Sequence, residues 1–309
     1  YHQDDYPAGD EEMGPRASLA NRRLGQDFSG KDGWSMYHGR KVPGFPRHPH
    51  RGFETVTIVD RGYLDHSDSL GATARVGPGD VQWMTAGRGI CHAEMFPLRS
   101  REEENPTEFF QIWLNLPARR KMSEPRFTMF WDHQVPVHTE PGVKVRTVSG
   151  AVGAGTVPAP PPDSWASEPG VELAMWVMEL EAGARWTLPA VGEGVVRSLY
   201  FYDGAQLGAG EQDHGVGHRL ILEGHGALPL EARGGKGARL LLLQGRPIGE
   251  PVVSHGPFVM NTQEEIRTAF SDYRRDQFGG WPWPSDAPVH GRDKGRFAVH
   301  ADGRTEEPA

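Results

Sequence analysis

Glycine and proline divide this chain into short apolar runs along almost its whole length. The sequence holds 40 glycines and 26 prolines in 309 residues, spread between the runs and not gathered in one tract. Residues 55–59 (TVTIV) are rich in β-branched side chains, and residues 109–116 (FFQIWLNL) end at Pro117. Many short strands separated by turns predict an all-β fold, either a sandwich or a barrel.

Two strand-rich blocks of similar size flank a stretch of different composition. Residues 150–170 hold few apolar side chains and contain three consecutive prolines, as expected of a linker. We therefore predict one β-domain at 22–149 and a second at 171–283. The residues before 22 are expected to be loose, and residues 284–309 are expected to form an extended polar tail.

One helix is predicted near the end of the second block. Thr262 and Glu265 have the spacing of a capping box, in which each side chain bonds the backbone of the other residue. Helical spacing continues through the apolar residues Ile266, Ala269, Phe270 and Tyr273. We expect this helix to pack its apolar stripe on a barrel.

Composition excludes several classes of function. The formal net charge is -8 and no basic stripe is present, which argues against a nucleic-acid partner. No apolar run approaches the ~20 residues of a membrane span, and the acidic N-terminus lacks the apolar core of a signal peptide. Cys91 is the single cysteine, so no internal disulfide can form. These features predict a cytoplasmic protein without a membrane partner.

The first candidate for chemistry is the segment HPHRGFE at residues 48–54. Side chains alternate between the two faces of an extended chain, so His48 and His50 point the same way, and Glu54 is able to share that face. Pro49 cannot donate a ladder hydrogen bond, which places this segment at the start of a strand or on a sheet edge. Two imidazoles in this arrangement can bind one metal ion.

The second candidate is the segment HAE at residues 92–94, which repeats the same spacing after a glycine-rich turn. Together the two segments can bring three imidazoles and a carboxylate to one point. Such a ligand set suits Fe, Mn, Ni, Cu or Zn, and ligand chemistry alone does not choose among them. Four protein ligands on an octahedral ion leave two positions for water, substrate or dioxygen.

For the polar residues near these two segments, the sequence predicts locations and supporting roles less definitely. His66 and Asp68 lie in the turn-rich segment DHSDS and are expected on a surface loop, with a role at a cavity rim as the alternative. Cys91 is expected to lie buried in the barrel wall, because adjacent strand residues face opposite sides. Arg51 and Gln82 are candidates for orienting the ligands.

At this point the residues resemble a known family. The stretch HPHRGFETVTIVDRG, then DHSDSLG, GPGDVQWMTAGRGICHAEM and GPFVMNTQEEIRTAF, closely resembles the pirin family of bicupins. The resemblance covers about residues 45–278 and is strongest over 45–97. It implies two cupin (jelly-roll-like) β-barrels in tandem with a C-terminal helix. The segment before Phe45 and the tail after Phe278 depart from the family pattern.

The resemblance also implies one mononuclear metal ion, usually iron as Fe(II), in the N-terminal cupin. The family's ligands correspond here to His48, His50, His92 and Glu94. It selects Glu94 over Glu54 as the carboxylate ligand, and it implies a second cupin without metal.

Two functions follow from the resemblance. Bacterial members are associated with quercetin 2,3-dioxygenase activity, which implies a small aromatic substrate, dioxygen, and Glu94 as the acceptor of the substrate's hydroxyl proton. Animal members are linked to iron- and redox-dependent regulation through protein contacts, which is the alternative. The net acidic charge and the lack of a nuclear-localisation run or a DNA-reading motif favour the enzyme.

Overall fold

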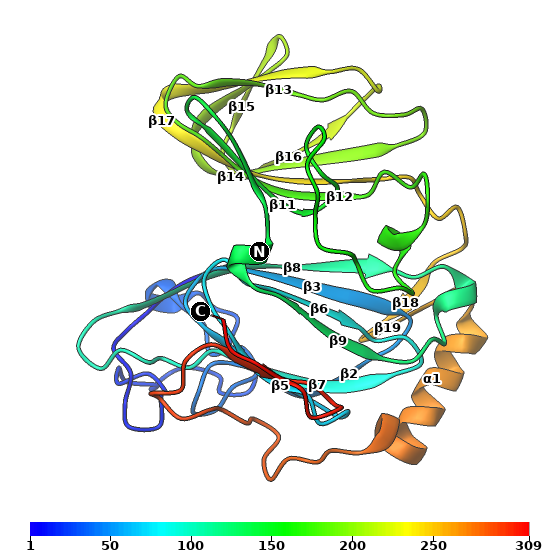
Figure 1. Ribbon diagram of the computed structural model, residues 1–309. Helices are drawn as coiled ribbons and strands as arrows, with labels where there is room; N and C mark the ends of the chain where they lie inside the picture. The colour runs from blue at the N-terminus through cyan, green and yellow to red at the C-terminus, as the bar shows by residue number, and fades with distance from the viewer. Residues whose placement is uncertain (309) are drawn as a thin grey trace. The chain divides into compact units, whose positions relative to one another are not determined.

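The structure is a computed structural model that describes residues 1–308 (Figure 1). The chain forms two compact units. The first combines Tyr1–Asp132 with the C-terminal segment that begins at Glu250, and the second is formed by His133–Gly249. None of the helices in the described part of the chain has the length and apolar character needed to cross a membrane.

The first unit is built from two antiparallel sheets (Figure 1). One sheet has the order β1 (His2–Tyr6), β8 (Asn105–Asn115), β3 (Phe53–Arg61), β6 (Val81–Thr85) and β9 (Arg126–Phe130). The other has the order β2 (Gly44–His50), β7 (Ile90–Met95), β4 (Leu64–Asp68), β5 (Thr73–Val76), β20 (Phe297–Val299) and β21 (Thr305–Glu306).

The core of the first unit lies between these sheets. Val59 and Phe109 from one sheet pack in the same buried cluster as Leu64, Ala74 and Val76 from the other. Burial of such apolar surface is the main force that closes the two sheets on each other. The remaining elements are short: β18 (Val253–His255) pairs with β19 (Phe258–Met260), and the 3-10 helices η1 (Lys31–Gly33) and η2 (Ala118–Arg120) lie in connections.

The second unit is a single bent sheet of eight strands. Its strands are β10 (Val137–Glu140), β11 (Val143–Ser149), β12 (Ala174–Leu180), β13 (Arg185–Leu188), β14 (Val196–Ala209), β15 (Gln212–Gly215), β16 (His218–Leu222) and β17 (Leu228–Gly245). The long strands β14 and β17 pair with each other and each takes two further partners, with register shifts in β14 where it bends. Its core cluster consists of apolar side chains, among them Trp176, Leu199 and Leu240.

The predicted helix is confirmed as α1 (Gln263–Asp276), with both hydrogen bonds of the Thr262–Glu265 capping box present. Its buried residues Ile266 and Ala269 cluster with Phe258 and Met260 of β19. The helix ends in η5 (Gln277–Gly279). Two further 3-10 helices lie earlier in the chain: η3 (Asp132–Gln134), and η4 (Trp165–Ser167) within the predicted linker.

The division into units differs from the boundaries expected from composition. Strands β10 and β11, expected in the first domain, belong to the second unit, where β10 pairs with β11 and β11 pairs with β12. Helix α1, expected in the second domain, belongs to the first unit. Both termini are also more ordered than expected. Strand β1 pairs with β8 and buries Tyr6 completely, and β20 in the expected polar tail pairs with β5.

The ordered N-terminus has a consequence for stability at acidic pH. The carboxylate of Asp4 in β1 accepts hydrogen bonds from the backbone of Ser35 at 2.9 Å and the hydroxyl of Tyr37 at 2.8 Å. Burial nevertheless raises the pKa of Asp4 from 3.8 to about 6. The folded state therefore holds this proton more tightly than the unfolded state does.

We expect the contribution of Asp4 to the free energy of unfolding to be largest below pH 3.8. It should decline as the pH rises to about 6, by up to about 3 kcal/mol. Asp4→Asn should flatten this part of the pH profile in urea unfolding followed by near-UV circular dichroism. An unchanged slope between pH 4 and 6 would contradict the assignment.

Candidate metal centre

Three histidines converge because β2 and β7 are neighbouring antiparallel strands. His48 lies directly opposite His92 in the register of this pair, and His50 is two residues further along β2 on the same face. One ligating nitrogen from each of the three rings lies within 4.8 Å of the other two. The ring centroids are 4.3 Å apart for His48 and His92 and 4.8 Å apart for His48 and His50.

Burial and unpaired nitrogens show that these residues fit a metal ion. His50 and His92 are almost fully buried, and Nε2 of His50 and both ring nitrogens of His92 have no hydrogen-bond partner. Buried polar atoms are rarely left without a partner, so an unpaired cluster of this kind indicates a ligand. Burial also lowers the pKa of His48 to about 4 and the pKa values of His50 and His92 well below 6.5. The neutral rings that result are the form that binds a metal.

Backbone carbonyls orient two of the rings. Nδ1 of His48 bonds the carbonyl of Pro46 at 2.9 Å, and Nδ1 of His50 bonds the carbonyl of Pro257 at 3.4 Å. A carbonyl only accepts, so each Nδ1 carries the proton and each Nε2 is left with a free lone pair. Pro257 lies in the C-terminal segment, which therefore contributes to the ligand geometry.

Glu94 lies beside the three histidines rather than within their cluster. Its Oε2 is 3.7 Å from Nε2 of His92 and accepts a hydrogen bond of 2.7 Å from Nε2 of Gln111. Thr57 Oγ1 donates to the other oxygen of Glu94 at 3.4 Å. Burial raises the pKa of Glu94 above 4.5, and the hydrogen bond from Gln111 opposes that rise. A cation at the histidines would favour the carboxylate form.

The structure separates Glu54 from this group. Glu54 and Thr57 are three residues apart on β3, which puts their side chains on opposite faces of the strand. Thr57 reaches Glu94, whereas Glu54 is fully buried and accepts a 2.7 Å hydrogen bond from the hydroxyl of Thr85. Its face is therefore the one directed away from the histidines.

The expectation of a surface loop for His66 and Asp68 was wrong. Both are fully buried in β4, where they lie opposite Glu94 and His92 in the register with β7. Nε2 of His66 is 3.1 Å from Oδ2 of Asp68, and Nδ1 of His66 is 2.8 Å from Nε2 of Gln82. The i, i+2 spacing of His66 and Asp68 is the same signal that identified the ligand segments, and it was overlooked because the surrounding residues resemble a turn.

Among the other neighbours, the expected burial of Cys91 is confirmed. Cys91 is buried in the barrel wall, where its thiol donates to the carbonyl of Gln277 at 3.4 Å. Arg51 connects the ligand segment to the C-terminal helix: its Nη1 is 2.8 Å from Asp272, and its Nε donates to the carbonyl of Arg88. Gln111 was not identified from the sequence, although a polar residue in the middle of the apolar run FFQIWLNL was a usable signal.

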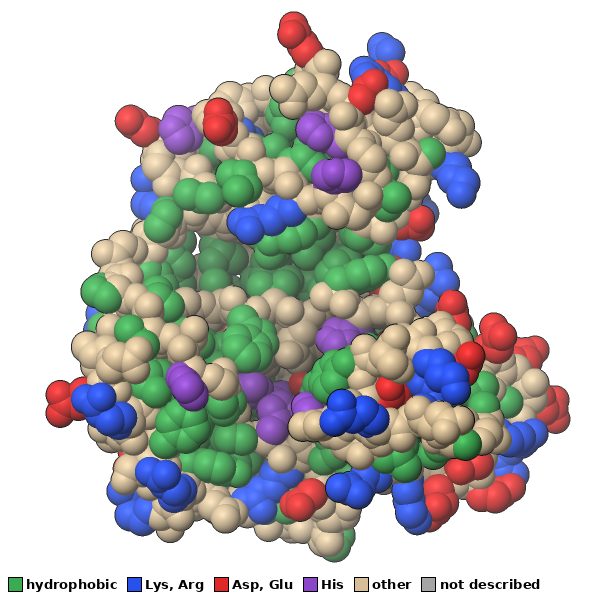
Figure 2. All heavy atoms as spheres, turned by 180° about the vertical axis from the view of Figure 1, so that it is seen from behind, with side chains coloured by type: hydrophobic (Ala, Val, Ile, Leu, Met, Phe, Trp, Pro, Cys, Tyr) green, Lys and Arg blue, Asp and Glu red, His purple; other side chains and the backbone are tan. Residues whose placement is uncertain are grey.

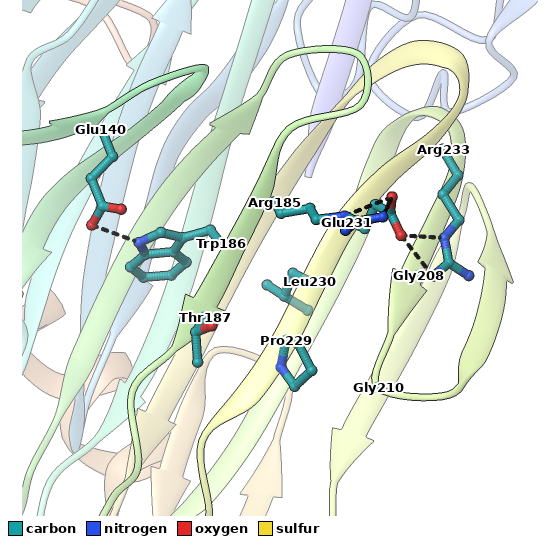
Figure 3. Close-up of a pocket in the computed structure, with 10 residues that line it drawn as sticks. All are labelled: Glu140, Arg185, Trp186, Thr187, Gly208, Gly210, Pro229, Leu230, Glu231 and Arg233. Carbon is teal, nitrogen blue, oxygen red and sulfur yellow. Dashed lines mark hydrogen bonds and ion pairs between the residues drawn. The ribbon is translucent and has the colours of Figure 1, made fainter.

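The second unit contains a pocket of different character (Figure 3). Glu231 lies between Arg185 and Arg233 and receives hydrogen bonds from both, and Trp186 donates to Glu140 (Figure 3). Both arginines of this pocket are thus paired with the same carboxylate. Within residues 1–308, the histidines of the first unit are the one group whose ligating atoms cluster as a metal site requires.

Two β-barrel units with a buried histidine triad on paired strands of the first define a bicupin. Comparison with known families agrees: the model described as Pirin matches residues 12–114, and the Pirin C-terminal cupin domain matches residues 175–279. The chain belongs to the pirin family.

Similar proteins come from several lineages. A "Pirin-like protein" of Caulobacter vibrioides is 39% identical over 265 residues, which cover 85% of this chain and 90% of that protein. A "Putative quercetin 2,3-dioxygenase" of Pseudomonas aeruginosa is 40% identical over 75% of this chain and 79% of its own length. Among solved structures, "Quercetin 2,3-dioxygenase from Acinetobacter baumannii" matches with a TM-score of 0.69 and 31% identity, covering 78% of this chain and 81% of that one.

Proposed function

We propose that this pirin binds one mononuclear metal ion, Fe(II) in the first instance, and uses it as a dioxygenase of small aromatic substrates such as flavonols. The observation that carries the proposal is the buried triad of His48, His50 and His92, whose unpaired nitrogens lie beside the carboxylate of Glu94. The names of the similar proteins from Pseudomonas and Acinetobacter support the choice of reaction.

The donor set limits the choice of metal without fixing it. Three imidazoles and one carboxylate suit Fe(II), and they also accept Ni, Mn, Cu or Zn. Glu94 is assigned as the fourth ligand because it follows His92 by two residues on β7 and its carboxylate is 3.7 Å from the His92 ring nitrogen. Gln111 and Thr57 hold that carboxylate from the opposite sheet.

The chain's own residues suit the deprotonation of a substrate hydroxyl. When bound, the metal ion supplies Lewis acidity toward the hydroxyl and ketone oxygens of a flavonol and a binding position for dioxygen. Glu94 is the candidate proton acceptor, because its buried carboxylate lies beside the histidines that would hold the metal. Gln111 donates to Oε2 at 2.7 Å and Thr57 donates to Oε1 at the longer distance of 3.4 Å, so Oε1 is the more weakly held oxygen and the one we assign to receive the proton.

The experiment combines metal analysis with turnover. We expect protein loaded anaerobically with Fe(II) to consume quercetin and dioxygen in equal amounts and to release carbon monoxide and a depside. Quercetin absorbance and an oxygen electrode measure the two losses, and chelator-treated protein is the control. No turnover with Fe(II), Ni, Mn or Cu reconstituted in turn would reject the flavonol reaction.

A further inference from the structure

A tryptophan with a half-exposed ring lies beside the histidine triad. Trp113 on β8 is 50% exposed, although tryptophan is usually well covered. Its ring lies 5.5 Å from that of His50 in an edge-on arrangement and 4.5 Å from that of Phe53. Figure 2 shows histidine side chains gathered in a hollow of the first unit, with hydrophobic side chains around it.

The orientation of this indole is fixed by a hydrogen-bonded chain that reaches Glu94. Trp113 Nε1 donates to Oε1 of Gln111 at 3.3 Å, and Nε2 of Gln111 donates to Glu94 at 2.7 Å. The indole N–H of Trp113 needs an acceptor and the carboxylate of Glu94 needs a donor. The side-chain amide of Gln111 meets both needs in a single orientation. Gln111 and Trp113 are two residues apart on β8 and therefore share a face.

We propose that Trp113 is the stacking platform for a planar aromatic ligand of the metal centre. The inference rests on the proposed function, since it identifies where the aromatic substrate of that site would bind. One side of the indole packs near Phe53, and the exposed remainder offers a flat apolar surface beside the ligand His50. Aromatic rings favour offset stacking on such a surface, and a flat molecule that reaches the histidines lies within range of it.

Anaerobic binding tests this platform without any turnover. We expect Trp113→Leu to raise the Kd of metal-loaded protein for quercetin about tenfold or more, because the stacking surface is lost. Trp113→Phe retains an aromatic ring and should stay within about threefold of the wild type. Metal content per chain and the binding of azide, which needs the metal but no ring surface, should remain unchanged in both variants.

Phe28→Leu is the matched control. Phe28 is 57% exposed in the same unit, and its ring contacts Tyr37, His38 and Phe45 rather than the triad. Its replacement should leave the Kd for quercetin unchanged. An equal loss of affinity in Phe28→Leu and Trp113→Leu would overturn the proposal, and so would an unchanged Kd in Trp113→Leu.

The outcome is separable from that of the proposed reaction. Trp113-dependent binding without turnover would reject the dioxygenase and support the platform. Turnover by wild-type protein with an unaffected Kd in Trp113→Leu would reject the platform and support the dioxygenase. If Trp113→Leu instead dissociates a dimer, measured by sedimentation, and leaves the Kd unchanged, the exposed indole is a contact between two copies and the platform is rejected.

Discussion

His92→Ala is expected to abolish stoichiometric metal binding while leaving the fold intact. His92 is central to the triad, since its ring lies within 5 Å of the rings of both His48 and His50. Changes to residues that merely support a ligand typically cost 10–100-fold in affinity, so loss of a ligand itself should cost more than about 100-fold. Removal of an unpaired buried ring leaves no broken hydrogen bond behind.

Two measurements check this expectation. Elemental analysis of protein reconstituted with Fe(II) should find about one metal per chain in the wild type and almost none in His92→Ala. Added metal should raise the unfolding temperature of the wild type alone, because only a state that binds the ligand is stabilised by it. His133→Ala removes an exposed histidine and serves as the control. Full metal content in His92→Ala would contradict the ligand assignment.

Asp65→Ala is expected to lower the free energy of unfolding of the first unit by about 3–5 kcal/mol. Asp65 and Arg75 form a fully buried pair with two hydrogen bonds of 2.7 and 2.8 Å. The same guanidinium donates to backbone carbonyls of His290, Gly291 and Lys294. Loss of the carboxylate leaves a buried cation whose remaining partners are neutral, which is the costly way to break such a pair.

Urea unfolding measures the loss, and limited proteolysis localises it. Since Arg75 holds the segment 290–294 against β5, the variant should be cleaved faster in this segment than the wild type. Glu12→Ala, which breaks the exposed pair of Glu12 with Lys41, should shift neither measurement noticeably. A loss of less than about 1 kcal/mol in Asp65→Ala would show that the segment is held mainly by β20 and its neighbours.

Local patterns in the sequence were sufficient for the strands and for the histidine triad. The i, i+2 spacing places two side chains on one face of a strand whatever the rest of the fold does, so the shared direction of His48 and His50 could be predicted without knowledge of their neighbours. The capping box of α1 is equally local. The choice between Glu54 and Glu94 depends on which faces of two strands meet, and spacing alone left it open.

The features that could not be predicted from the sequence depend on pairing between distant segments of the chain. His66 and Asp68 join the site because β4 lies beside β7, and Gln111 joins it because the two sheets face each other. The sequence of the C-terminal segment resembles a polar tail, because its few apolar residues occur only in short runs such as residues 297–299. Their burial is decided by a partner strand more than 200 residues earlier in the chain.

The first unit is built from two segments that are far apart in the chain, and this sets an order of events during synthesis. Residues 1–132 leave the ribosome first, but Pro257, whose carbonyl orients His50, follows only after the whole of the second unit. At about 5–20 residues per second, that interval lasts on the order of 10 s. During this time the nascent barrel carries its histidines without their last orienting contact. For the metal centre that we propose, tight capture of the ion is therefore expected late in the life of the new chain, once its C-terminal end has arrived.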